Sequence, residues 1–280
     1  MKLRMAGCLW GAALMVGLLP LDRARGQGGW RLAENGGAIP SQPVAVFEAG
    51  GSGIRITALP AGMELQQSPG LGPGWRKCGV DPVSRLVAYV HGSPSFDPSG
   101  FSLACTVGNL LQAPDGAPMK VIKKVQQWHG NFLPFTLYLA EGPNPLPVGA
   151  PLRDGSGRVA GVVSRVESRG RVLLVPGEVV ERVVADLVEH GRLRRAHLGV
   201  SMSPARPEAS LTQVMDGGAA ARAGLKAGDR IRKVDGAPVS GYADAVHAFF
   251  LMRPGRQAAV EIARDGRVMV LEVKPDLATK

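Results

Sequence analysis

Residues 144–163 constrain the fold more than any other stretch of this sequence. They read NPLPVGAPLRDGSGRVAGVV, a proline-rich loop followed by two short apolar runs around Asp154-Gly155. An aspartate–glycine pair between apolar runs favours a tight turn, because glycine adopts a positive φ without steric penalty. We therefore expect a loop, a strand over 149–152, a turn and a second strand over 158–163. The 38 glycines and 22 prolines of the whole chain suit many short strands better than a helical bundle.

The 280 residues are enough for two domains of ordinary size. Apolar runs bounded by turn residues predict further strands over 44–47, 53–57, 86–90, 101–107, 121–125, 135–139 and 171–175. Residues 176–191 predict the clearest helix, because valine and leucine recur at helical spacing between a proline and a glycine. A second helix is expected over 242–252, and a hairpin joins 259–263 to 268–273 across Asp265-Gly266.

The loop over 144–152 resembles the nucleophile loop of HtrA/DegP-like serine proteases, which reads Asn-Pro-Gly-Asn-Ser-Gly-Gly-Pro-Leu. The matching residues are Asn144, Pro145, Gly149, Pro151 and Leu152. The position that carries the nucleophilic serine in that family is occupied by Val148. The resemblance therefore implies a trypsin-like fold without its nucleophile.

Residues 78–90 (CGVDPVSRLVAYV) resemble a second stretch of the same family, Asp-Pro-x-x-Asp-Leu-Ala-Val-Leu. Asp81-Pro82 and the strand over 86–90 match, but Arg85 stands where the family has the aspartate that orients the catalytic histidine. A cation there would oppose an imidazolium. No histidine occurs between Gln27 and Arg85, so the resemblance implies that all three catalytic positions are empty. The upstream region is also short, and we expect an abbreviated first barrel.

Residues 194–276 resemble the PDZ domains of HtrA proteases, most closely over 217–236 (GGAAARAGLKAGDRIRKVDG). Independently of the resemblance, a glycine-containing loop before a strand can aim successive backbone N–H groups at a carboxylate. The strand can then pair with an extended peptide beside a neighbouring helix. The expected peptide-binding residues are His197, Leu198, Gly199, Val200, Met202, Val246 and Phe250. Ala245 and Phe249 form the alternative face of the helix.

Residues 1–26 predict an export signal, because Lys2 and Arg4 precede an apolar run and Ala24-Arg25-Gly26 resembles a cleavage site. An uncleaved anchor is the alternative. A flexible leader over 27–43 and a periplasmic or cell-envelope location follow from this interpretation. Export leaves Cys78 and Cys105, which either form a disulfide or remain two separate buried thiols.

The formal charge of +10 comes from basic residues that are interleaved with acidic ones. Only 5% of residues are aromatic, so few side chains could stack on bases and we expect no nucleic-acid partner. Contact with a membrane is expected only through an uncleaved signal or weak surface charge. No group of residues has metal-ligand spacing and no loop has the phosphate-binding pattern, so neither a metal nor another cofactor is predicted.

The sequence thus predicts a mostly β chain with a few helices. An abbreviated trypsin-like double β-barrel (44–175) is followed by a linking helix (176–193) and a PDZ domain (194–276). The predicted function is that of an exported HtrA-like pseudoprotease. It would bind protein C-termini or unfolded, extended peptide segments, as a scaffold or adaptor in envelope protein quality control. The alternatives are an active serine endopeptidase whose catalytic residues lie elsewhere, and a structural subunit that assembles with active HtrA-like homologues.

Overall fold

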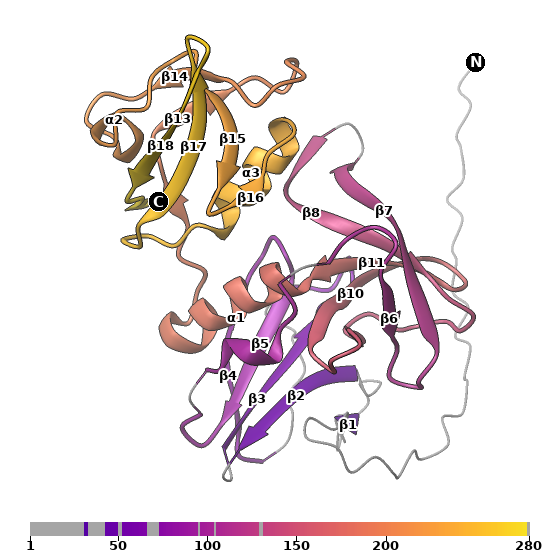
Figure 1. The fold of residues 1–280 in the computed structure, drawn as a ribbon. Helices are drawn as coiled ribbons and strands as arrows, with labels where there is room; N and C mark the ends of the chain where they lie inside the picture. Colours follow the sequence, from indigo (N-terminus) through magenta and orange to yellow (C-terminus); the bar gives the residue numbers. More distant parts are fainter. Residues whose placement is uncertain are drawn as a thin grey trace, which may run out of the picture.

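The computed structural model describes residues 31–32, 43–49, 52–65, 73–94, 96–103, 105–128 and 131–278. It has a five-stranded sheet, a closed β-barrel and a smaller C-terminal domain (Figure 1). The predicted export signal lies outside the described residues, as does most of the predicted leader. Over the part of the chain that is described, no helix is long and apolar enough to cross a membrane.

The first sheet has the strand order β1-β2-β3-β5-β4, with every neighbouring pair antiparallel. Its strands are β1 (Arg31–Leu32), β2 (Pro43–Ala49), β3 (Ser52–Ala58), β4 (Trp75–Val80) and β5 (Leu86–His91). Within the described ranges these strands form an open sheet. β4 was not predicted, since Arg76, Lys77 and Gly79 interrupt its apolar pattern.

The second unit is a closed barrel with the order β10-β11-β8-β7-β6-β9. Its strands are β6 (Leu110–Gln112), β7 (Pro118–Trp128), β8 (Asn131–Glu141), β9 (Pro151–Arg153), β10 (Val159–Ser168) and β11 (Arg171–Pro176). The turn expected at Asp154-Gly155 joins β9 to β10, and the Asp154 side chain accepts hydrogen bonds from Ser156 and Arg158.

The strand predicted over 101–107 is wrong. A 3₁₀ turn, η2 (Pro98–Gly100), leads into Phe101, which makes only an isolated bridge to Val159. The chain then turns at Gly108, whose φ is +96°, and its amide donates to the carbonyl of Val121. The apolar run that suggested a strand therefore does not join the ladder of the barrel.

Helix α1 (Gly177–His190) leads from the barrel toward the C-terminal domain (Figure 1). Four of its valines and Leu187 are fully buried in one cluster with residues of the first sheet and the barrel, and Val188 packs against this cluster while partly buried. The buried members include Ile56 and Ala88 of the first sheet and Val159 and Val175 of the barrel. Gly191 ends the helix in the left-handed conformation (φ +71°) and donates its N–H to the carbonyl of Leu187. The helix therefore joins the two parts of the N-terminal domain through a shared core.

The C-terminal domain has its own core, built around Leu211, Ile231, Val260 and Ile262. Its strands are β12 (Ala196–His197), β13 (Val200–Met202), β14 (Leu211–Val214), β15 (Arg230–Val234), β16 (Ala237–Pro238), β17 (Ala258–Arg264), β18 (Arg267–Val273) and β19 (Asp276–Leu277). Its helices are α2 (Ala219–Arg222) and α3 (Tyr242–Leu251), and α3 also packs against β8 of the barrel. The hairpin predicted across Asp265-Gly266 joins β17 to β18.

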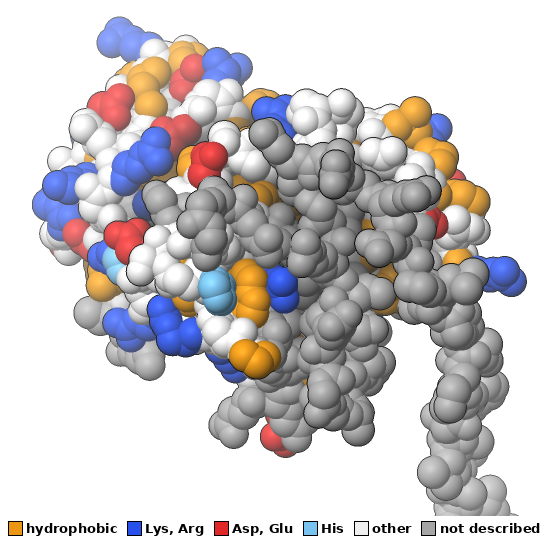
Figure 2. Space-filling model, turned by 90° about the horizontal axis from the view of Figure 1, so that it is seen from below, with side chains coloured by type: hydrophobic (Ala, Val, Ile, Leu, Met, Phe, Trp, Pro, Cys, Tyr) orange, Lys and Arg blue, Asp and Glu red, His pale blue; other side chains and the backbone are white. Residues whose placement is uncertain are grey.

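The charged surface is mixed. On the face shown in Figure 2, Lys and Arg side chains lie among Asp and Glu side chains. Surface ion pairs such as Arg230–Glu208 (2.8 Å) and Arg222–Asp276 (2.7 Å) hold part of this charge. The interleaving of acids and bases in the sequence is therefore kept on the surface of the fold.

Replacement of Gly177 tests how closely α1 approaches the barrel. A Cβ there would lie 2.3 Å from the carbonyl oxygen of Ser102 and 2.6 Å from that of Val159. Because backbone atoms cannot move aside like a flexible side chain, Gly177→Ala should lower the free energy of unfolding by about 1–3 kcal/mol. Urea denaturation measures the change, and Gly155→Ala is the matched control, since its Cβ would meet nothing within 4 Å. Equal stability of the two variants would contradict the close approach.

Candidate functional site

The loop that resembles a nucleophile loop carries no hydroxyl at Val148. The Val148 side chain is partly buried and packs against the core shared by the first sheet, the barrel and α1. Gly149 has a φ of +90° and donates to the carbonyl of Val163 at 2.8 Å, while Ala150 donates to the carbonyl of Pro147 at 3.1 Å. The loop thus keeps a tight, hydrogen-bonded backbone around an apolar side chain.

Arg85 has a role in the backbone of the first domain. Its φ is +61°, unusual for a residue other than glycine, and its amide donates to the carbonyl of Asp81. Its guanidinium donates to three carbonyl oxygens, those of Leu59 (3.1 Å), Pro60 (2.8 Å) and Met63. Arg85 therefore ties the segment after β3 to the turn before β5.

A cleft of about 170 Å³ lies beside Arg85, between this turn and the outside of the barrel. Phe135 and Leu137 of β8 and Val175 of β11 contribute apolar walls. The cleft holds neither a histidine nor a carboxylate among its lining residues. The position that matches the family's aspartate thus faces a mostly apolar surface.

His190 and His247 make hydrogen bonds to groups other than serine side chains. His190 lies 3.0 Å from a guanidinium nitrogen of Arg194, and His247 accepts a hydrogen bond from the backbone N–H of Thr136. The Ser164 hydroxyl donates to the carbonyl of Leu173, and Ser156 bonds to Asp154. The geometry therefore brings none of these serines to either histidine. Within the described ranges no group of three or more His, Cys, Asp or Glu side chains could hold a metal ion.

The disulfide suggested between Cys78 and Cys105 is not formed, and both are free thiols. Cys78 is half-buried on β4 against the core shared with α1, whereas Cys105 is buried in the separate core inside the barrel. Burial raises the pKa of Cys78, and burial together with the nearby Glu178 raises the pKa of Cys105 to about 12. The alternative of two separate, unreactive thiols describes the structure.

The loop over 197–199 is held by two backbone hydrogen bonds. Gly199 has a φ of +75°, and its carbonyl accepts the N–H of Met215 at 2.7 Å. The carbonyl of Leu198 accepts the N–H of Ala220 at 2.9 Å. With both carbonyls fixed inward, the amides of Leu198 and Gly199 have no acceptor among the described residues. Successive free N–H groups of this kind can bind a carboxylate.

The strand after this loop, β13, pairs with β14 and with no other described strand. Val200 and Met202 are partly buried and pack against the core of the C-terminal domain, while Ser201 between them is exposed. Leu198 is buried and His197 is exposed. The predicted loop and strand residues therefore lie together at one edge of this domain.

Helix α3 divides its side chains among three directions. Ala245, Ala248 and Phe249 belong to the core of the C-terminal domain, which removes Ala245 and Phe249 from the candidate groove. Phe250 packs on the barrel, with its ring 4.8 Å from that of Phe135. Val246 is partly exposed and belongs to neither core. The predicted pair is thus split, and Val246 is the residue on α3 that stays available to line a groove.

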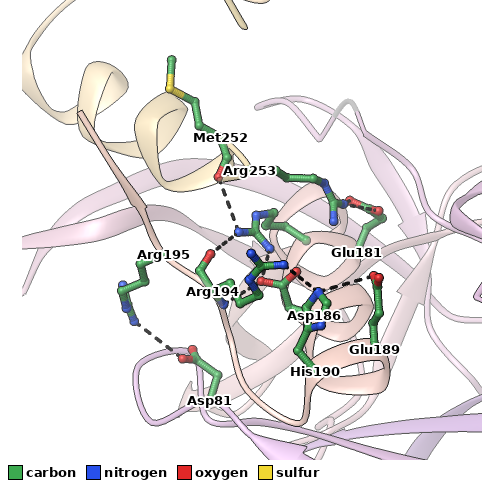
Figure 3. A network of polar contacts seen from close by, with 10 residues as sticks. Asp81, Glu181, Asp186, Glu189, His190, Arg194, Arg195, Met252 and Arg253 are labelled. Carbon is green, nitrogen blue, oxygen red and sulfur yellow. Dashed lines mark hydrogen bonds and ion pairs between the residues drawn. The ribbon is translucent and has the colours of Figure 1, made fainter. Parts of the chain in front are cut away.

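A buried polar network joins the two domains, and most of its members are labelled in Figure 3. The Arg182 side chain is only 2% exposed and forms an ion pair with Asp186 at 2.7 Å. It also donates to the carbonyls of Arg194 (2.6 Å) and Met252 (3.4 Å). Asp186 in turn accepts the backbone N–H of Arg194 at 2.6 Å. The exit helix of the barrel, the linker and the end of α3 therefore meet at one guanidinium.

Two outer ion pairs extend this network. Arg253, which follows α3, contacts Glu181 of α1 at 2.7 and 2.9 Å. Arg195 of the linker lies 3.6 Å from the buried Asp81 of the first domain and 5.6 Å from the ring of Phe250. These contacts were not predicted from the sequence. The signal available was the Arg182–Asp186 pair at i, i+4 on an otherwise apolar helix.

These features define an N-terminal β domain, with an open sheet and a closed barrel, that contacts a smaller C-terminal domain through a polar network. The PDZ model matches residues 196–274. Together with the relatives described next, this match supports the predicted resemblance to HtrA-like proteins with a PDZ domain, and the mostly β fold class is confirmed.

The curated relatives described here are both named DegP-like periplasmic serine endoproteases. A probable periplasmic serine endoprotease DegP-like from Pseudomonas fulva is 33% identical over 147 residues, which are 46% of this chain and 31% of that protein. A protein of the same name from Pseudomonas putida is 28% identical over 185 residues, 58% of this chain and 39% of the relative. Matches to this chain thus span about a third of the length of these curated relatives.

Among solved structures, the HtrA-type protease AlgW with a decapeptide is 20% identical and covers 86% of this chain and 84% of its own, with a TM-score of 0.49. A serine endoprotease from Yersinia pestis is 15% identical and covers 90% of this chain and 96% of its own, with a TM-score of 0.44.

Breaking the Arg182–Asp186 pair should release the PDZ domain. Arg182→Met leaves a buried carboxylate without its cation and two carbonyls without a donor, so we expect a loss of about 3–5 kcal/mol in the free energy of unfolding. The double variant Arg182→Met/Asp186→Leu should be less destabilised than Arg182→Met. Urea denaturation measures both, and limited proteolysis of residues 191–195 reports the release.

The matched control is Arg171→Met, which removes an exposed ion pair with Glu141 (side chains 56% and 43% exposed). Exposed pairs contribute about 0–1 kcal/mol, so the control should unfold almost as the unmodified protein does. If Arg182→Met were as stable as the control, the buried network would not hold the domains together.

Proposed function

We propose that this HtrA-like protein binds the C-terminal carboxylate and last residues of other proteins, or extended unfolded segments, through its PDZ domain. We further propose that it is a pseudoprotease that acts as an exported scaffold or adaptor in the cell envelope. The observation that carries the proposal is the loop over 197–199, whose carbonyls are fixed inward while the amides of Leu198 and Gly199 lack an acceptor among the described residues.

The edge of β13 supports the second part of the binding mode. A peptide whose carboxylate lies at the loop can extend along β13 and add a strand beside it, because β14 occupies one edge of β13 alone. Val246 on α3 then supplies an apolar wall for the side chain of the last residue. The peptide would be held by backbone hydrogen bonds, with one pocket for selectivity.

The empty catalytic positions support the absence of proteolysis. Val148 has no nucleophilic atom, and Arg85 bonds three backbone carbonyls instead of orienting a histidine. The relatives are named serine endoproteases, so the competing function is an active protease with a different set of catalytic residues. The name of these relatives also supports an envelope location for this chain.

Binding of a free C-terminus gives the first test. Fluorescein-labelled decapeptides with an apolar last residue should bind with a free carboxylate and lose affinity when amidated. Val246→Glu should weaken binding at least about 10-fold, since a charge would replace an apolar wall and about 1.4 kcal/mol corresponds to a factor of ten. Fluorescence anisotropy measures the dissociation constants.

Val270→Glu is the matched control for this variant, because Val270 is on β18 of the same domain and is 57% exposed. It should bind like the unmodified protein. Equal affinity for free and amidated peptides, or an equal loss in both variants, would refute carboxylate recognition by this groove.

Labelling with a fluorophosphonate separates the pseudoprotease from the competing protease. The probe reacts with an activated serine, and the proposed function predicts no covalent adduct and no casein cleavage. Intact-protein mass spectrometry detects the adduct, with an active trypsin as the positive control. An adduct that one Ser→Ala substitution abolishes would show that the chain is an enzyme.

A further inference from the structure

His247 of α3 enters the boundary between the PDZ domain and the barrel. Its Nδ1 accepts the backbone N–H of Thr136 in β8 at 3.1 Å. Because Nδ1 is the acceptor, the neutral ring carries its hydrogen on Nε2. Nε2 lies 3.7 Å from an Oε1 of Glu178 at the start of α1. The two side chains are only 18% and 14% exposed, so α3, β8 and α1 meet around one imidazole–carboxyl contact.

Burial outweighs the groups that would stabilise a charge here, which are a backbone N–H and Lys124 for the Glu178 carboxylate and Asp244 for a protonated His247. The second carboxyl oxygen of Glu178 is buried without a hydrogen-bond partner. The positive charge of Lys124 of β7 lowers the pKa of both Glu178 and His247. Lys124 also forms an ion pair with Asp244 of α3 at 3.8 Å. Tyr138 of β8 and the Cys105 thiol, the other titratable groups near Glu178, are held neutral by raised pKa values.

Burial shifts the two groups in opposite directions. It raises the pKa of Glu178 from 4.5 to about 7, and it lowers the pKa of His247 from 6.5 to about 4. In the closed contact, between pH 4 and 7, Glu178 therefore keeps its proton and His247 stays neutral. When the domains separate, water favours a carboxylate and an imidazolium between pH 4.5 and 6.5, so the pair still holds one proton.

We propose that Glu178 and His247 act as a neutral pair that holds one proton across the domain boundary, and that this pair makes the closing of the PDZ domain on the barrel almost independent of pH. The proposal concerns this contact alone and does not depend on peptide binding. The number of protons bound by the pair then stays the same when the contact opens. An ion pair in this place would change in strength with pH.

Each group alone would make the contact strongly dependent on pH. With His247 alone, the closed state binds fewer protons than the open one, so closing weakens as pH falls from 6.5 toward 4. With Glu178 alone, the closed state binds more protons, so closing weakens as pH rises from 4.5 toward 7. Between pH 5 and pH 8 the equilibrium constant for closing then changes about 30-fold with His247 alone, and about 70-fold in the opposite direction with Glu178 alone. For the intact pair it changes less than about 3-fold.

Exchange of the Thr136 amide with deuterium is a direct readout, because this N–H donates to His247 only in the closed contact. Protection is measured at pH 5 and pH 8 and corrected for the intrinsic effect of pH on exchange. Glu178→Gln should lose about 30-fold of its protection at pH 5 relative to pH 8, and His247→Gln about 70-fold at pH 8 relative to pH 5. The glutamine at 247 retains an acceptor for the amide but cannot titrate.

The unmodified protein and the double variant Glu178→Gln/His247→Gln should both change less than about 3-fold between these pH values. Glu141→Gln controls for removal of a titratable group outside the contact, because its ion pair with Arg171 is exposed, and it should behave like the unmodified protein. A slope in the unmodified protein as large as in a single variant would overturn the proposal. So would single variants with no slope or with slopes of the same sign.

Discussion

The guanidinium of Arg182 lies where the exit helix of the barrel, the linker and the end of α3 meet. Its partners are Asp186 and the carbonyls of Arg194 and Met252, which come from three different segments. Burial lowers the pKa of Arg182 and the bond to Asp186 opposes that shift, so the cation depends on its partner. A buried ion pair adds little net stability over apolar residues, but it penalises any arrangement in which a partner is lost. This dependence fixes how the PDZ domain sits on the barrel.

The orientation of the PDZ domain determines which part of α3 is available for a ligand. Phe250 contacts Phe135 and His247 contacts Thr136, so these residues belong to the barrel side of the helix. Ala245 belongs to the core of the PDZ domain, and Val246 lies between these two directions. The barrel thus narrows the candidate face of α3 to the one that carries Val246.

Local sequence signals predicted the local structure well. Asp265-Gly266 marked a hairpin because few other pairs adopt its turn, and the valine stripe over 176–191 marked α1 because its period is that of a helix. The contacts between domains could not be predicted in the same way. Nothing in the local sequence distinguishes Arg194 and Arg195 from solvated surface charges, and only the fold brings them to Asp186 and Asp81. Likewise, the choice between the two faces of α3 depended on the barrel packed against it.

The disulfide and the strand over 101–107 were also predicted from local sequence, and neither is formed. Two cysteines in an exported chain suggest a pair, but Cys78 and Cys105 belong to different cores. The apolar run after Phe101 has the composition of a strand, but among the described residues only Phe101 makes a bridge, to Val159. In each case the local chemistry permitted the prediction and the three-dimensional arrangement decided against it.

The hydrogen bonds of Arg85 limit which side chains this position can hold. Its three hydrogen bonds to the carbonyls of residues 59, 60 and 63 hold a segment that an aspartate could not hold, because a carboxylate accepts hydrogen bonds and cannot donate them to carbonyls. An aspartate at this position would therefore leave three backbone carbonyls without their donor. The local backbone thus depends on a long donor side chain at the position where the resembling protease family has a carboxylate.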